Sequence, residues 1–209
     1  MDTVLIFAGG DPLRPELAQD LPVPDMVVAA DSGYEAAVSL GYHVNVVVGD
    51  MDSIITSPLP EHVIVERYPV DKDQTDLDLA MELAIREDPG RLVIVGGTGG
   101  RHDHELANAG LICSTRWEAV EEIDWVSSRS RSHVVRQRRM VHGDVGALVT
   151  LLPVGGSVEG ITTRGLQWDL SDAYLVPGST RGVSNVMRSP VADISISAGC
   201  LLVIFPEKE

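Results

Sequence analysis

Short apolar runs alternate with polar or amphipathic stretches through the N-terminal part of the chain. An apolar run of four to eight residues bounded by turn residues is typical of a buried strand. Such runs predict strands at residues 4–8, 26–30, 44–48, 62–66, 92–95 and 123–126. Helical stretches separate several of these runs, which indicates a mostly parallel α/β sheet with helices on both faces.

The helix expected after residue 75 has the most complete set of signals. Apolar residues recur at helical spacing between residues 77 and 85. Thr75 is suited to cap the helix, and Asp76 and Asp78 place negative charge in its first turn, where the helix dipole favours it. Two further helices are predicted at residues 34–40 and 105–112.

The pattern changes near residue 127. The polar run at residues 127–132 predicts a linker, and no convincing helix follows it. Strands are predicted at residues 133–140, 146–152, 166–170, 173–176, 192–197 and 201–205, separated by glycine-containing turns. We therefore expect an α/β domain at residues 1–128 and a C-terminal antiparallel β-sandwich at residues 129–209.

Composition and charge disfavour two classes of protein, general nucleic-acid binders and membrane-spanning proteins. The net charge of −15 disfavours a general nucleic-acid binder, which needs a basic face. No apolar segment is long enough to span a membrane. Cys113 and Cys200 are far apart in sequence, in apolar surroundings and without zinc-site spacing, so we predict reduced core residues and a cytoplasmic location.

A glycine-dense turn is the most informative stretch of the chain. Residues 96–104 contain four glycines followed by Arg101, His102, Asp103 and His104, and they join a predicted strand to a predicted helix. Glycines let the backbone approach a ligand, and the following helix N-terminus favours anions. Arg101 is suited to bind phosphate through its two-pronged guanidinium.

Carboxylates follow several predicted strands and are expected to meet at one edge of the sheet. Asp31 follows one strand, Asp50 and Asp52 follow another, and Asp73 and Asp76 precede the third helix. Such a cluster favours a cation, and an oxygen-only ligand set favours Mg²⁺ held together with substrate phosphates. Asp50 and Asp52 are the best metal candidates, although either could form only a structural turn.

Other polar residues in these regions could have purely structural roles. Asp76 could be only a first-turn acid, Lys72 only a solvated lysine, and His104 only a packed histidine. In the C-terminal part, composition alone favours a core role for Trp168, and turn chemistry could explain Ser184 and Asn185.

Taken together, these motifs resemble the thiamine pyrophosphokinase family. The resemblance covers about residues 30–190, and its motifs occur in the family's order. The matching stretches are 31–33, 49–54, 72–76, 99–104 with Asn108, 165–170 and 184–185.

The resemblance implies a function and a set of site residues. The family transfers pyrophosphate from ATP to the hydroxyl of thiamine, with Mg²⁺, and is homodimeric with the active site near the subunit interface. The implied catalytic residues are Asp50, Asp52, Asp73, Asp76, Arg101 and Asp103, with Asp50, Asp52 and Asp73 on the metal. The nucleotide side would also use Asp31, Lys72, Gly99, Gly100 and His104, and thiamine would meet Trp168, Ser184 and Asn185.

Two positions depart from the family pattern. Met51 stands where phenylalanine is usual, which is a tolerable apolar exchange, and Val186 stands where an acid usually follows the Ser-Asn pair. The second departure concerns the acceptor more than the phosphate chemistry. Two alternatives stay open at this point: a pyrophosphokinase acting on another alcohol such as a hydroxymethylpterin, and a non-catalytic nucleotide- or thiamine-binding regulator.

Overall fold

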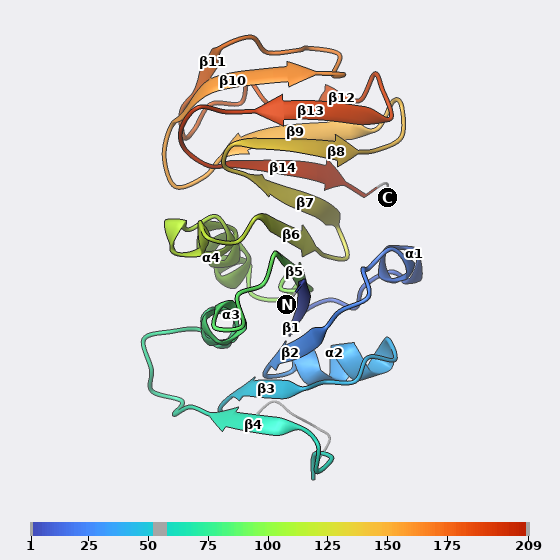
Figure 1. Cartoon of the computed structure of the whole chain (residues 1–209), viewed down its shortest axis with the longest axis vertical. Coiled ribbons are helices and arrows are strands. Elements are labelled where there is room, and N and C mark those ends of the chain that lie inside the picture. Colours follow the sequence, from blue (N-terminus) through green and yellow to red (C-terminus); the bar gives the residue numbers. More distant parts are fainter. Residues whose placement is uncertain (1, 52–57, 208–209) are drawn as a thin grey trace. The chain divides into compact units, whose positions relative to one another are not determined.

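The computed structural model describes residues 2–51 and 58–207. The chain divides into two compact units, coloured from blue to green and from green to red along the sequence in Figure 1. The first unit comprises Met1–Asn108 and Ala119–Ser128, and the second comprises Ala109–Glu118 and Arg129–Glu209. Among the described residues, no helix is both long enough and apolar enough to span a membrane.

The first unit contains six parallel strands. Its strands follow the spatial order β6-β5-β1-β2-β3-β4, and each neighbouring pair is parallel. The strands are β1 (Thr3–Ala8), β2 (Met26–Ala30), β3 (Val46–Gly49), β4 (Ile64–Arg67), β5 (Arg91–Val95) and β6 (Glu122–Val126). The helices are α1 (Pro15–Gln19), α2 (Gly33–Ser39), α3 (Asp76–Ile85) and α4 (His102–Ile112), the last of which ends in the second unit.

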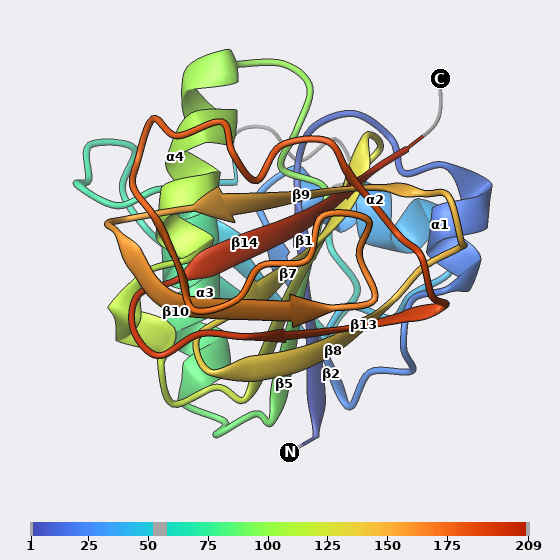
Figure 2. The same ribbon diagram turned by 90° about the horizontal axis from the view of Figure 1, so that it is seen from above.

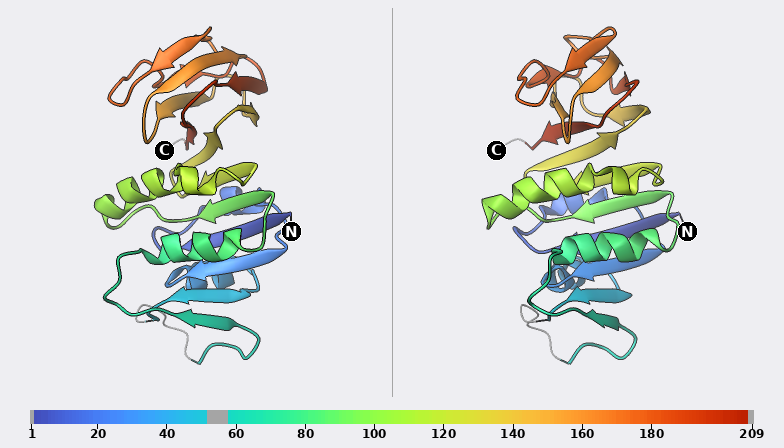
Figure 3. Two further views of the ribbon diagram at one scale, coloured as in Figure 1. Left: turned by 60° about the vertical axis from the view of Figure 1, so that its left-hand side comes forward. Right: turned by 90° about the vertical axis from the view of Figure 1, so that its left-hand side faces the viewer.

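Both faces of this sheet are covered, as the two side views in Figure 3 show. Strand residues of one parity, such as Leu5 and Phe7, pack with Tyr34 and Ala37 of α2. Because side chains alternate along a strand, the residues between them face the opposite side, where α3 contacts the central strands. Burial on both faces explains why these strands are apolar runs without alternation.

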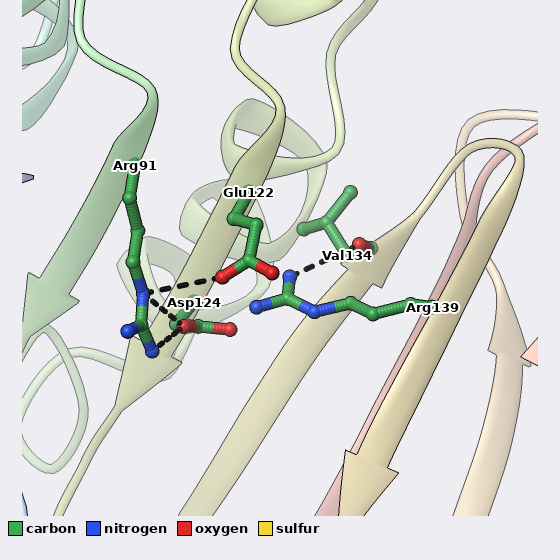
Figure 4. A network of polar contacts seen from close by, with 5 residues as sticks. All are labelled: Arg91, Glu122, Asp124, Val134 and Arg139. Carbon is green, nitrogen blue, oxygen red and sulfur yellow. Dashed lines mark hydrogen bonds and ion pairs between the residues drawn. The ribbon is translucent and has the colours of Figure 1, made fainter. Parts of the chain in front are cut away.

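The amino ends of β5 and β6 carry a compact ion-pair network (Figure 4). Asp124 has 2% of its surface exposed. It accepts hydrogen bonds from Nε of Arg91, at 3.0 Å, and from the terminal nitrogen Nη2 of the same side chain. Glu122 lies at 3.5 Å from the Arg91 Nε. This buried carboxylate is therefore fully matched by a cation.

The second unit is an antiparallel two-sheet structure. One sheet has the order β12-β9-β14-β7 and the other β11-β10-β13-β8; β13 lies between β10 and β8 in Figure 2. An apolar core of valine, leucine and isoleucine side chains from both sheets fills this unit. The elements are η1 (Thr115–Trp117), β7 (Ser130–Val135), β8 (Arg138–His142), β9 (Leu148–Pro153), β10 (Val158–Arg164), β11 (Ala173–Leu175), β12 (Asn185–Val186), β13 (Val191–Ser195) and β14 (Leu201–Pro206).

Several predicted boundaries in the second unit are wrong. The expected linker at residues 127–132 overlaps β7, and Ser132 is 2% exposed because it pairs with Ile204 of β14. The strand expected at residues 133–140 is a hairpin of two strands that turns at residues 136–137.

Two further differences lie around β10. The strand expected at residues 166–170 is a turn, closed by the Asp169 carboxylate, which accepts hydrogen bonds from the Leu166 N–H and the Thr163 hydroxyl. The β10 strand itself was not predicted. Gly160, at φ 62°, lies where the β10–β11 register shifts and interrupts the alternation that marks a strand.

Candidate active site

A cavity of about 720 Å³ lies at the carboxyl ends of the parallel strands of the first unit. Its wall includes residues from the turns that follow β1, β2, β3 and β5. Strand β1 lies between β2 and β5, so the chain leaves the middle of the sheet in two directions from this point. Ligands of open α/β sheets bind at such a switch point. The topology therefore places several of the predicted site residues in one ligand-sized hollow: Asp31, Asp50, Lys72, Asp76, Gly99, Gly100, Arg101 and His104.

The glycine-rich turn after β5 forms one wall of this cavity. Gly96 has φ 88°, and a Cβ atom there would collide with the Ala8 carbonyl oxygen. A side chain at Gly99, with φ 77°, would likewise collide with the Asp11 carboxylate. Only glycine therefore lets the turn pack this closely against the end of β1.

Two side chains hold the start of this turn. The Asn108 amide donates a hydrogen bond to the Gly97 carbonyl at 2.9 Å, and the Trp125 indole donates to the Gly96 carbonyl at 2.8 Å. Asn108 is 7% exposed and lines the cavity. The turn is thus rigidly placed before any ligand binds, which lowers the entropy lost on binding.

Three carboxylates converge on the opposite wall. Asp31, Asp50 and Asp76 all line the cavity. Burial raises the pKa of Asp76, the neighbouring Lys72 lowers it, and the charges of Asp31 and Asp50 raise it further. One buried oxygen of Asp31, Oδ1, has no hydrogen-bond partner among the described residues. Concentrated, incompletely matched negative charge of this kind suits a cation.

These carboxylates do not make a closed metal cage by themselves. Within residues 2–51 and 58–207, no group of three acidic, histidine or cysteine side chains is arranged to hold a metal alone. Mg²⁺ is usually held by one or two carboxylates together with substrate phosphates and water, so an open acidic wall fits this ion. Asp52, predicted as a metal ligand, lies outside the described residues.

Lys72 supplies positive charge beside the acidic wall. Its Nζ lies 3.1 Å from Oδ1 of Asp76 and donates a hydrogen bond to the Pro69 carbonyl at 3.2 Å. The predicted cap of α3 is confirmed, because the Thr75 hydroxyl accepts a hydrogen bond from the Asp78 N–H. The cap and the ion pair together fix the start of α3 against the cavity. Asp73 is exposed and is not among the cavity-lining residues.

Arg101 and Asp103 form an exposed pair at the start of α4. The Arg101 guanidinium donates to both carboxylate oxygens of Asp103, with the Nε bond at 3.1 Å. These bonds lower the pKa of Asp103 to about 2. Arg101 and His104 line the cavity, whereas Asp103 does not. Asp103 therefore orients Arg101 from outside the wall.

The predicted acceptor-side residues lie in the second unit. Trp168 is 57% exposed, so the core position that composition favoured is wrong. Asn185 is buried and fixes the Trp168 backbone, because its amide group accepts from the Trp168 N–H and donates to the Trp168 carbonyl. Ser184 has φ 57°, a left-handed conformation that is unusual for a non-glycine residue. A buried amide thus presents an exposed aromatic ring.

Some cavity residues were not singled out from the sequence. Thr98 has a buried hydroxyl without a hydrogen-bond partner among the described residues, and Ser32 and Gln74 also line the wall. Gly9 and Gly10 line it as well, directly after β1. The Gly-Gly pair at the end of an apolar run was the available signal, since its place matches that of the turn after β5.

Family models cover most of the chain. The model described as "Thiamin pyrophosphokinase, catalytic domain" matches residues 21–122, and "Thiamin pyrophosphokinase, vitamin B1 binding domain" matches residues 132–201. Thiamine pyrophosphokinase of Bacillus subtilis is 26% identical over 98% of both chains, and thiamine pyrophosphokinase 2 of Arabidopsis thaliana is 28% identical over 80% of this chain and 67% of that protein.

Solved structures agree with these matches. The crystal structure of the Bacillus subtilis thiamine pyrophosphokinase superposes with a TM-score of 0.84 at 25% identity over the whole of both chains. A thiamin pyrophosphokinase family protein from Enterococcus faecalis gives 0.81 at 26% identity, again over both whole chains. The mixed α/β sheet followed by an antiparallel sandwich is the fold that these proteins share with this chain. The chain therefore belongs to the thiamine pyrophosphokinase family.

Proposed function

We propose that this protein transfers the terminal pyrophosphate group of ATP to the hydroxyl group of thiamine, producing thiamine diphosphate and AMP. The observation that carries the proposal is the cavity at the switch point of the first unit, where a glycine-rich turn, two cations and an acidic wall meet. Both family models and the full-length relatives support the same reaction. No feature of the site favours a pterin acceptor or a non-catalytic role.

The glycine-rich turn and the two cations would hold the triphosphate. Gly99 and Gly100 allow the backbone to approach phosphate oxygens, and the α4 N-terminus favours their charge. Arg101 offers a two-pronged donor pre-aligned by Asp103. Lys72, held beside Asp76, adds a point charge on the opposite side. His104 lines the same wall and would contact the nucleotide.

The acidic wall would hold Mg²⁺ together with the phosphates. The unpartnered Oδ1 of Asp31 and the mutual repulsion around Asp76 are the features that fit a cation. Asp31, Asp50 and Asp76 are the described carboxylates that would hold it, and the roles predicted for Asp52 and Asp73 remain predictions. When bound, Mg²⁺ would neutralise phosphate charge that develops as AMP leaves.

The protein itself would mainly position the reactants. Attack of a primary alcohol on the β-phosphorus needs alignment and charge neutralisation more than covalent help. Asp103 is a poor base for the hydroxyl proton, since its pKa is about 2 and Arg101 engages both of its oxygens. We therefore assign Asp103 to the positioning of Arg101.

The acceptor would be bound through the second unit. The exposed Trp168 ring offers a flat apolar surface suited to stacking on a cationic aromatic ring. Asn185 would set the direction of that ring through its two bonds to the Trp168 backbone, and Ser184 lies beside it in the chain. We further propose that the protein is a cytoplasmic homodimer, as the family resemblance implies. Light scattering of the purified protein tests the oligomeric state.

Product formation tests the proposed reaction. Purified protein is incubated with ATP, Mg²⁺ and thiamine, and both products are followed by chromatography. We expect thiamine diphosphate and AMP in equal amounts. AMP release that needs a hydroxymethylpterin in place of thiamine would overturn the acceptor assignment, and thiamine binding without either product would overturn the catalytic one.

A further inference from the structure

A second cavity, of about 710 Å³, lies entirely in the second unit and has no part in the proposed reaction. It is lined by both cysteines of the chain, Cys113 and Cys200. Cys113 follows the last turn of α4, and Cys200 directly precedes β14. Residues that are 87 positions apart in sequence therefore meet at one hollow, whose volume is that of a small-molecule pocket.

The two thiols are close enough to act on each other. Both cysteines are free and buried, with 5% and 8% of their surfaces exposed. A hydrogen bond joins the two thiols, and it lowers the pKa of Cys200 while it raises that of Cys113. The pair therefore has one sulfur that ionises first and one that retains its proton.

A cation lies beside this pair. Arg136 lines the same cavity, and its charge lowers the pKa of Cys200. Its guanidinium donates hydrogen bonds to the carbonyls of Ile112 and Ser114, at 3.4 and 3.0 Å, which are the residues on either side of Cys113. Arg136 is thus anchored at the thiol pair and stabilises a thiolate there.

Four glycines form much of the remaining wall. Gly110, Gly155 and Gly156 have open space where a Cβ atom would stand, and Gly199, at φ 96°, directly precedes Cys200. The absence of side chains at these positions leaves room for a reagent next to the sulfurs. A structural core cysteine needs no such space and no neighbouring cation.

We propose that Cys113 and Cys200 form a dithiol site that exchanges with low-molecular-weight disulfides and closes into an intrachain disulfide. The Cys200 thiolate attacks one sulfur of the small disulfide, which releases one small thiol and leaves a mixed disulfide on Cys200. Cys113 then loses its proton and attacks the Cys200 sulfur, which releases the second small thiol. The protein is oxidised by two electrons, and the small disulfide is reduced to two thiols.

Intact mass measurement of the native full-length protein treated with bis(2-hydroxyethyl) disulfide tests this site. We expect the wild-type chain to lose two hydrogen atoms and a proteolytic peptide pair to appear that links Cys113 with Cys200. Reaction only after denaturation, or accumulation of two hydroxyethylthio adducts without a crosslink, would overturn the proposal.

Single variants separate the roles, because the chain contains only two cysteines. Cys113→Ser is expected to stop at one mixed disulfide on Cys200, whereas Cys200→Ser is expected to stay unmodified over the same time. Equal adduct formation in the two variants would contradict Cys200 as the attacking thiol. The denaturation midpoint of each variant shows whether its fold is intact.

Two substitutions of Arg136 test whether its positive charge activates the Cys200 thiol. A one-unit rise in the pKa of Cys200 reduces the thiolate tenfold but makes it more nucleophilic, so Arg136→Gln should slow the reaction about threefold at neutral pH. Its rate profile should move to higher pH, and Arg136→Lys should restore most of the rate. An unchanged profile in Arg136→Gln would show that the cation does not activate the thiol.

Discussion

The two ends of the parallel sheet differ in how their carboxylates are matched by positive charge. At the amino ends of the strands, Asp124 is matched by Arg91 through two hydrogen bonds. At the carboxyl ends, Asp31, Asp50 and Asp76 crowd one wall, and Asp31 has an oxygen without a hydrogen-bond partner among the described residues. The first arrangement balances its charge within the protein, whereas the second gathers three carboxylates beside one lysine.

Two residues at the carboxyl edge also have left-handed backbone conformations. Asp31 has φ 47° and Met51 has φ 69°, and both follow strands at the carboxyl edge. Left-handed conformations of non-glycine residues cost of the order of 1 kcal/mol and cluster at functional sites. At Asp31, this backbone strain and an unmatched carboxylate oxygen occur in the same residue, which costs stability in the absence of a ligand.

The largest expected effect is loss of turnover in Asp50→Asn. Removal of one cation-binding charge should reduce kcat by about 100-fold to 1,000-fold, with little change in the free energy of unfolding because charge repulsion at the wall falls. The check is turnover at saturating ATP over a Mg²⁺ titration, beside a denaturant titration. Near-normal turnover would show that the Asp50 charge is not needed to bind the cation.

Arg101→Ala should reduce kcat/KM by about 100-fold, because a charged donor to the phosphates is lost. Its side chain is 72% exposed, so the denaturation midpoint should not change. Arg101→Lys is the matched control: it keeps the charge but loses the two-pronged geometry, so it should recover only part of the activity. Full recovery would show that a point charge is sufficient.

At the opposite end of the sheet, Asp124→Asn should lower the free energy of unfolding by about 2 kcal/mol, below the value for a fully buried pair because Arg91 is partly exposed. Turnover of the folded variant should stay normal. Glu122→Gln is the control within the same network, and its exposed carboxylate should matter little. Equal losses of unfolding free energy in the two variants would show that burial does not determine how much each carboxylate contributes to stability.

Asp31 tests the strain at the carboxyl edge. Asp31→Gly and Asp31→Ala remove the same carboxylate, so both should bind nucleotide and Mg²⁺ equally weakly. Only alanine retains the penalty for positive φ, and Asp31→Gly should therefore be more stable by about 1 kcal/mol. Equal midpoints in thermal denaturation would show that the backbone relaxes.

The smallest effect is expected at an exposed ion pair in the second unit. Arg138 donates two hydrogen bonds to Asp193 and holds the pKa of that carboxyl below its usual value. The pair therefore stabilises the fold above the unfolded-state pKa of about 4, and this contribution is lost as the pH falls through the lower folded-state value.

Asp193→Asn should consequently differ from the wild type slightly at pH 7 and less at pH 2. The difference should be small even at pH 7, because the Arg138 side chain is 69% exposed. Denaturant titrations at the two pH values measure it. A larger difference at the lower pH would contradict the sign.

The first unit could be largely predicted from local patterns. Apolar runs placed β1, β2, β3, β5 and β6, and the capping signal of Thr75 located the start of α3. Parallel strands end at one edge, so the residues after them could be brought together by topology alone. The glycine-rich turn and Arg101 could be recognised from the sequence because they lie together in one short stretch.

The second unit was less predictable because its decisive interactions are non-local. Asp169 closes a turn where an apolar run indicated a strand, and the bulge at Gly160 disguised β10. Trp168 is exposed because Asn185, 17 residues away, holds its backbone.

The sequence by itself determined the family, the order of the polar motifs along the chain and several of the residues that line the first cavity, because these depend on short-range spacing. Only the tertiary structure decided that Asp103 does not line the cavity and that Asp124 is matched by Arg91. It alone brought Cys113 and Cys200 to one cavity. Burial and charge pairing arise from contacts between distant segments, and no local pattern records which segments will meet.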